Sequence, residues 1–129
     1  MSPEKQRIAI AEACGWRFLK SVADRDPDTL RMFYLAGLPP GEEPPHAGEF
    51  SVVVEVPNYP TDLNAMHEAE KTFQTSLEKQ SYTENLLFTM NTDPAGAGNW
   101  TECWDVCHAS AAQRAEAFLR TIGKWEDGE

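Results

Sequence analysis

The sequence predicts a small α/β (α+β) fold, a single-domain layered sandwich in which helices pack on a central, mostly antiparallel β-sheet. Its 129 residues, of which 41% are hydrophobic, are enough for one domain with one core. Segments with helical spacing and cap signals alternate with segments of period-two hydrophobicity. No internal repeat is visible. We therefore expect one domain over residues 1–129 in which helices alternate with strands.

The first helix and the first strand follow one another directly. Ser2 is a favourable N-cap, Pro3 suits the first helical position, and Gly15 is typical of a helix end. Residues 16–22 then alternate between apolar and polar side chains, which predicts a half-buried strand. The side chains that we expect on its buried face are Trp16, Phe18 and Val22.

The next segment ends in a long loop. Residues 28–36 fit either a short helix capped by Asp28 or an extended piece. Residues 37–48 contain four prolines and three glycines, which predicts a surface loop. Because long loops in small domains often carry function, Glu42 and Glu43 are candidate contact residues, and a tolerated insertion is the alternative.

The strongest strand pattern covers residues 49–56. Phe50, Val52, Val54 and Val56 share one face, which predicts the central strand of the sheet. A turn with two prolines follows. Thr61 or Asp62 is expected to cap the next helix, whose buried stripe would be Leu63, Met66, Ala69, Phe73 and Leu77.

The last third of the chain is less uniform. Residues 81–90 fit a helix opened by a Ser81 and Glu84 capping box, or a strand. Residues 91–98 predict a loop, and residues 100–108 alternate as a strand does, with a helical turn as the competitor. Ser110 and Gln113 form a capping box that opens a final helix. Its expected apolar stripe is Ala112, Ala115, Phe118, Leu119 and Ile122, closed by Gly123.

The charge distribution restricts the partners. The formal charge is −10, and neither residues 32–70 nor residues 81–113 contain a lysine or arginine. Such a field repels phosphate backbones, so direct nucleic-acid binding is not expected and a basic protein surface is the expected partner. A merely solvated acidic surface is the alternative. No segment has the length and apolarity of a membrane span or a signal peptide, which predicts a cytoplasmic protein.

The polar residues of the turn and helix at 58–70 are the candidate binding site. His67 and Glu68 begin like the H-E-x-x-H zinc helix, but Lys71 occupies the second histidine position. His67 and Glu70 share a helix face and could still form half of a metal or acid–base site, or be ordinary surface residues. The candidate binding residues are Asn58, Tyr59, Asn64, His67 and Glu70. No catalytic residue, metal or cofactor is assigned.

A second cluster of ligand types is Cys103, Cys107 and His108. Its spacing is poor for a zinc knuckle, and on a strand His108 would point away from the two cysteines. Reduced thiols at buried or boundary positions are the expected state.

Three segments together carry a resemblance. They are residues 8–16, 57–71 and 111–125, about a third of the chain, and they resemble the phage ABA sandwich domain family, small proteins encoded by phages and prophages. The resemblance implies layers of helix, sheet and helix and a bacterial host cytoplasm. It implies no catalytic residues.

These observations predict a non-enzymatic phage or prophage accessory protein that binds and inhibits a host protein, with a bacterial defence component as the sharpest form. One alternative is a module that sequesters a nucleotide-like ligand between aromatic side chains and Arg17, Arg114 or Arg120. Others are an acidic mimic of DNA and, less favoured, a metal-dependent hydrolase. A homodimer is compatible with each of them.

Overall fold

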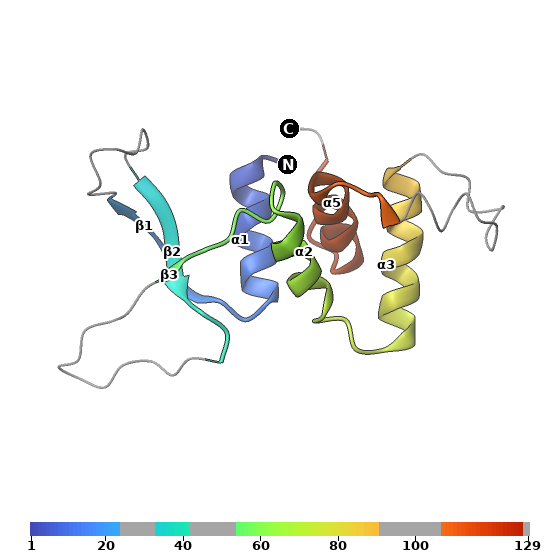
Figure 1. Ribbon diagram of the computed structural model, residues 1–129, viewed down its shortest axis with the longest axis horizontal. Coiled ribbons are helices and arrows are strands. Elements are labelled where there is room, and N and C mark those ends of the chain that lie inside the picture. The colour runs from blue at the N-terminus through green and yellow to red at the C-terminus, as the bar shows by residue number, and fades with distance from the viewer. Residues whose placement is uncertain (24–32, 42–53, 91–106, 128–129) are drawn as a thin grey trace. The chain divides into compact units, whose positions relative to one another are not determined.

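The computed structural model describes residues 1–23, 33–41, 54–90 and 107–127, and it confirms the predicted α+β class (Figure 1). These residues form four helices and a three-stranded antiparallel sheet. They group into two compact units, one of residues Ala11–Pro57 and one of Met1–Ile10 with Asn58–Glu129. The layering of helices on the sheet stays a prediction.

The sheet lies in the first of these units. Strand β1 (Arg17–Ala23) pairs with β2 (Phe33–Leu38), and β2 pairs with β3 (Val54–Glu55). The central strand of the described sheet is therefore β2, and Val54–Glu55, the described strand residues of the predicted central strand 49–56, pair with its side. Strand β2 is paired on both sides and is buried over its last four residues, whereas both residues of β3 are exposed. Residues 49–53 lie outside the described part.

The predicted face of the first strand is also corrected. Arg17 pairs with Leu38 and Lys20 with Ala36, so β1 contains one more residue than β2 between these pairs. The extra residue forms a bulge, in which Phe18 has a φ of 55° and lies 66% exposed. A bulge breaks the alternation from which a buried Phe18 was predicted.

Strand β2 extends into the predicted loop. Residues 33–36 are extended and not helical, and the strand runs on through Gly37 and Leu38 before the chain turns. A Cβ at Gly37 would lie 2.6 Å from Leu19 Cδ2 and 3.0 Å from the Arg17 carbonyl oxygen. Glycine is therefore used here for close packing. The part of the loop that contains Glu42 and Glu43 lies outside the described residues.

Helix α1 (Pro3–Ala13) has the predicted ends. The Lys5 backbone N–H donates to Ser2 Oγ over 3.3 Å, as an N-cap requires. Gly15 follows the helix with a φ of 101°. The cap signals in the sequence thus identified this helix correctly.

The predicted helix through Leu77 is instead two helices. Helix α2 (Leu63–Glu70) begins at Asp62, whose carboxylate accepts from Ala65 N, and ends at Glu70. Helix α3 (Ser76–Thr89) begins at Thr75 with a complete capping box to Glu78. Hydrophobic spacing alone hid this break, because Met66, Ala69 and Phe73 are buried as a continuous stripe would be, while Leu63 and Leu77 are exposed.

The Thr75 capping box gives a first prediction. We expect Thr75→Val to lower the free energy of unfolding by about 1 kcal/mol, whereas Thr75→Ser keeps the cap. Hydrogen bonds from the Thr75 backbone N–H and hydroxyl lower the pKa of Glu78 below its ordinary value of 4.5. A lowered pKa stabilises the fold above pH 4.5, and this contribution is lost as the pH falls through the folded-state value. Urea unfolding of both variants at pH 7 and pH 3.5 measures the contribution of the cap and its dependence on pH. Equal stability of the Thr75→Val and Thr75→Ser variants at pH 7 would contradict the prediction.

The rest of the chain is helical where it is described. Residues 81–89 belong to α3, so Ser81 lies inside a helix and caps nothing. Cys107 is helical and His108 lies in a turn, which corrects the strand prediction at these two positions; residues 100–106 lie outside the described part. Helix α5 (Ala111–Thr121) opens with the predicted Ser110 and Gln113 capping box, and Gly123 follows it with a φ of 75°.

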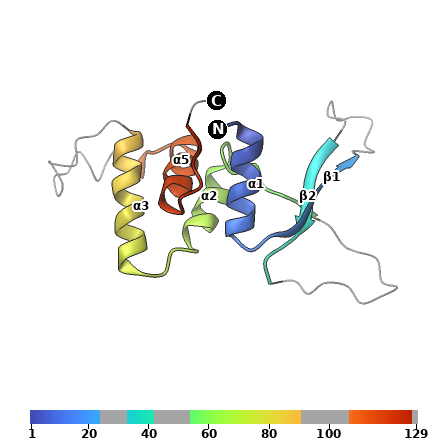
Figure 2. The same cartoon turned by 180° about the vertical axis from the view of Figure 1, so that it is seen from behind.

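The core of the helical unit lies between α2, α3 and α5. Helix α3 lies beside α5 in both views, and hydrogen bonds from Asn85 to Thr121 and from Thr89 to Glu116 show that the two run antiparallel (Figures 1 and 2). The Phe118 ring lies 4.9 Å from that of Phe73 between them. The contact between Phe118 and Phe73 therefore packs α5 against the turn that follows α2.

Candidate functional site

The five predicted binding residues that the structure describes, which leaves out Glu42 and Glu43, have different local roles. The Asn58 carbonyl oxygen accepts from the N–H groups of Thr61 and Asp62, so this exposed residue organises the turn before α2. Tyr59 is 4% exposed and belongs to the core. Asn64 and His67 are exposed on α2. The turn at residues 58–62 therefore serves chiefly to start helix α2.

Glu70 takes part in a mostly buried polar cluster with Arg114 and Tyr82. Arg114 Nη1 donates to Glu70 Oε1 over 3.0 Å, and Arg114 Nε donates to the Ala109 carbonyl oxygen over 3.2 Å. His67 Nδ1 lies at the edge, 3.9 Å from Glu70 Oε1. The Arg114 side chain is only 7% exposed. The cluster joins α2 to α5, and its charges are balanced within it.

The Tyr82 hydroxyl is buried close to Glu70 and Arg114, but its geometry toward the described residues does not meet the criteria of a hydrogen bond. Burial, followed by the nearby negative charge of Glu70, raises the pKa of this hydroxyl. The neutral form is therefore strongly favoured in the folded protein.

Replacing Tyr82 by phenylalanine gives the second prediction. Removing a buried hydroxyl that lacks a partner should leave stability unchanged or raise it by up to about 1 kcal/mol. Because the folded-state pKa is raised, the wild type keeps its stability below pH 10 and loses it as the pH rises further; the variant lacks this loss. Guanidinium unfolding between pH 8 and 11 tests both points, and a clear loss of stability in Tyr82→Phe at pH 8 would show that the hydroxyl is bonded.

Two sets of possible metal ligands were weighed in the sequence, His67 with Glu70 and Cys103, Cys107 with His108, although no metal was assigned. Among the described residues, no group of three or more His, Cys, Asp or Glu side chains is placed to hold a metal ion. Cys107 and His108 are both exposed, and Cys103 lies outside the described part. His67 faces Glu70, whose carboxylate already binds Arg114.

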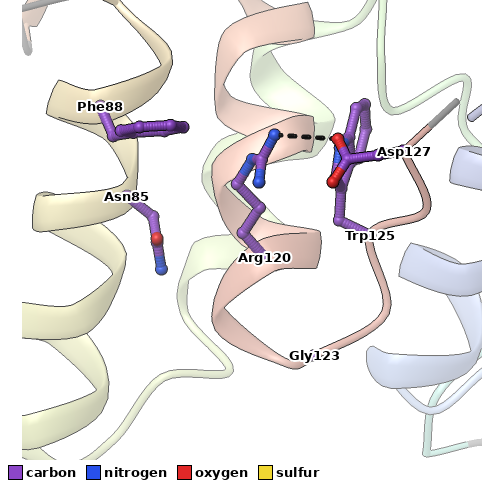
Figure 3. A pocket seen from close by; sticks show the side chains of 6 residues that line it. All are labelled: Asn85, Phe88, Arg120, Gly123, Trp125 and Asp127. Carbon is purple, nitrogen blue, oxygen red and sulfur yellow. Dashed lines mark hydrogen bonds and ion pairs between the residues drawn. The ribbon is translucent and has the colours of Figure 1, made fainter.

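A pocket of about 420 Å³ lies between α3, the end of α5 and the segment that follows it (Figure 3). Its lining residues are Asn85, Phe88, Arg120, Gly123, Trp125 and Asp127. Figure 3 shows Arg120 in the middle, with Phe88 on one side and Trp125 and Asp127 on the other. The pocket brings together residues that are more than thirty positions apart in the sequence.

The Arg120 guanidinium is held by rings and by carboxylates. Its central carbon lies 5.3 Å from the Phe88 ring centre and 5.4 Å from that of Trp125, within the range of cation–π attraction. Nε donates to Glu116 Oε2 over 3.1 Å, and Nη2 donates to Asp127 Oδ1 over 3.4 Å. The Trp125 indole N–H donates to the same Asp127 oxygen over 2.9 Å. Arg120 therefore links the residues on the two sides of the pocket through these contacts.

Of the ionised groups around the pocket, Arg120 and Asp127 line it and Glu116 binds Arg120 from outside the lining, so the three groups together carry one net negative charge. One guanidinium faces two carboxylates, and the Asp127 side chain is 80% exposed. A phosphate would meet an arginine whose charge is already matched. A cationic side chain would meet the exposed carboxylate of Asp127, whose Oδ1 also accepts from Arg120 and Trp125, and would lie near two aromatic rings of a kind that attract ammonium and guanidinium groups. The chemistry of the pocket thus favours a cation over an anion.

Of these residues, Arg120 was predicted only as a contact of a nucleotide-like ligand, and the roles of Trp125, Asn85 and Asp127 were not predicted. The spacing of Glu116 and Arg120, four apart on a helix, was the one local signal for an ion pair. The remaining contacts depend on the antiparallel packing of α3 and α5, which no local pattern indicates.

No protein-family model, curated protein or solved structure matches this chain. None of the described helices has the length and apolarity needed to cross a membrane.

Proposed function

We propose that the protein is a non-enzymatic binding protein that engages a basic surface of another protein through the pocket around Arg120. The observation that carries the proposal is the pairing of Arg120 with both Glu116 and Asp127, beside the exposed ring of Phe88. The lining therefore offers two aromatic rings and one exposed carboxylate, and the charge of its arginine is already matched. The formal charge of −10 adds long-range attraction for a basic partner.

The biological setting that we propose is a phage or prophage accessory protein acting in a bacterial host cytoplasm, where binding would inhibit a host protein such as a defence component. This part rests on the resemblance of residues 8–16, 57–71 and 111–125 to the phage ABA sandwich family. A small acidic binding protein suits such a role, because inhibition by binding needs no catalytic group.

Capture from bacterial lysate tests the proposal. Immobilised wild-type protein should retain a defined host protein, and salt of about 0.5 M should weaken the capture, since ionic contacts between exposed groups are screened. Phe88→Ala and Asp127→Asn should each reduce capture strongly. Phe33→Ala is the matched control, because Phe33 is an exposed phenylalanine of the sheet unit. Absence of a specific protein, or equal capture by the Phe88 and Phe33 variants, would contradict the proposal.

We expect the protein to bind nucleotides only weakly, because its described arginines near the aromatic residues are already paired. Arg120 is bonded to two carboxylates, and Arg114 is buried and bonded to Glu70, so neither is available to hold a phosphate. We expect millimolar ATP, GTP or cyclic dinucleotides to raise the melting temperature by less than about 1 °C. A shift of several degrees with one of them in differential scanning fluorimetry would favour ligand sequestration instead.

A further inference from the structure

Helix α3 exposes two large apolar side chains on one side. Leu77 is 76% exposed and Phe88 is 64% exposed. They are eleven residues apart, which is close to three full helical turns, so they point to the same side roughly 16 Å apart along the axis. The buried residues Tyr82 and Leu86 occupy a different side of the helix, toward the core. Leu77 and Phe88 thus belong to a solvent-facing stripe.

An acidic residue lies between these two anchors. Glu84 is seven residues after Leu77 and four before Phe88, so it falls on the same side of α3. It is exposed, and it accepts a hydrogen bond from Gln80 Nε2 over 3.3 Å. We call Leu77, Glu84 and Phe88 the α3 stripe. Its order along the helix is apolar, acidic, apolar.

The α3 stripe is continuous with the pocket, because Phe88 belongs to both. Across the pocket from Phe88, the Asp127 carboxylate is exposed and Trp125 presents its indole (Figure 3). The stripe and pocket together therefore form one surface that runs the length of α3 and carries acidic groups beside apolar ones.

We infer that this surface binds a basic amphipathic helix of the partner protein. Two apolar side chains of that helix, three turns apart, would pack on Leu77 and Phe88. A lysine or arginine between them would pair with Glu84, and another would reach Asp127. The inference rests on the proposed function and deepens it, since it names the kind of partner surface that the acidic pocket accepts.

Charge favours a basic helix over two other possible occupants of this surface, a second copy of the chain and an anionic membrane. A second copy of the chain, packed antiparallel through α3, would place Leu77 near Phe88 but would also bring the two Glu84 carboxylates within about one helical turn of each other. Like charges so placed are unfavourable. An anionic membrane surface would be repelled by a protein of charge −10. A cationic helix satisfies both the apolar anchors and the acids.

Fluorescence anisotropy with synthetic helices tests this inference. The probe is a labelled helical peptide of about 18 residues, with leucines three turns apart and lysines between them. The matched control peptide has glutamate at every lysine. We expect wild-type protein to bind the basic peptide, and Leu77→Ser or Phe88→Ser to weaken that binding about tenfold. Phe33→Ser should leave it unchanged.

A charge exchange makes the test specific. Glu84→Gln should lower the affinity for the basic peptide about threefold. Glu84→Lys should shift the binding preference toward the acidic peptide. All of these side chains are exposed, and circular dichroism checks that each variant keeps its helix content. Failure of the wild type to prefer the basic peptide, or binding that ignores Leu77 and Glu84, would overturn the inference. Lysate capture that depends on Phe88 would still support the proposed function in that case.

Discussion

Phe118→Ala is expected to lower the free energy of unfolding by about 4 kcal/mol, the largest effect of any single substitution considered for this chain. The Phe118 ring is fully buried, lies 4.9 Å from the Phe73 ring, and sits on the helix that pairs with α3. Truncation removes its apolar burial and leaves a cavity that the surrounding helices fill only in part. For a small domain this loss is a large share of the total stability.

Urea unfolding followed by circular dichroism measures the effect, with Phe88→Ala as the matched control. Phe88 is a phenylalanine of similar size on the neighbouring helix, but it is 64% exposed, so its truncation should change stability by no more than about 0.5 kcal/mol. Similar losses in the two variants would mean that Phe118 does not form the core described here.

Arg114→Met should be the second largest change, a loss of about 3 kcal/mol. Methionine keeps an unbranched but shorter side chain, and it removes the donors to Glu70 and to the Ala109 carbonyl oxygen. Glu70 is then a largely covered carboxylate that has lost its principal counter-charge. Because Glu70 retains some exposure, the expected loss lies at the lower end of the range for buried pairs.

The double variant Glu70→Leu and Arg114→Met separates pairing from packing. If the loss in Arg114→Met comes from the unpaired carboxylate, removing Glu70 as well should recover much of the stability. Chemical unfolding of the single and double variants gives this coupling directly. A double variant that is less stable than Arg114→Met alone would assign the effect to lost packing.

Local signals predicted helix starts well in this chain. The Ser110 and Gln113 capping box and the Asp62 cap were found because the bonds that they make span only three residues. The same signal was present at Thr75 and Glu78, yet the apolar spacing of Met66, Ala69 and Phe73 concealed it. Phe73 lies in the turn between α2 and α3, and its side chain is buried although it belongs to neither helix, so helical periodicity does not apply to it.

The sheet and the pocket depended on contacts between distant residues. The bulge at Phe18 is visible only in its register against β2, and the centre of the sheet was decided by which strand is paired on both sides. Likewise, Phe88 and Trp125 flank Arg120 only because α3 and α5 pack side by side. Of the polar residues predicted as a binding site, Asn58 lies in the turn before α2, Tyr59 is buried, and Glu70 binds Arg114.

Nuclear magnetic resonance titration of the labelled protein with the basic peptide tests the central claim, binding of a basic protein surface through the pocket and the α3 stripe. We predict that amide shifts will concentrate at residues 77–88 and 120–127 and will diminish as salt is added. The strands of the sheet unit should remain unchanged. Shifts centred on β1–β3, or none at peptide concentrations of about 1 mM, where even a weak complex would form, would contradict the account.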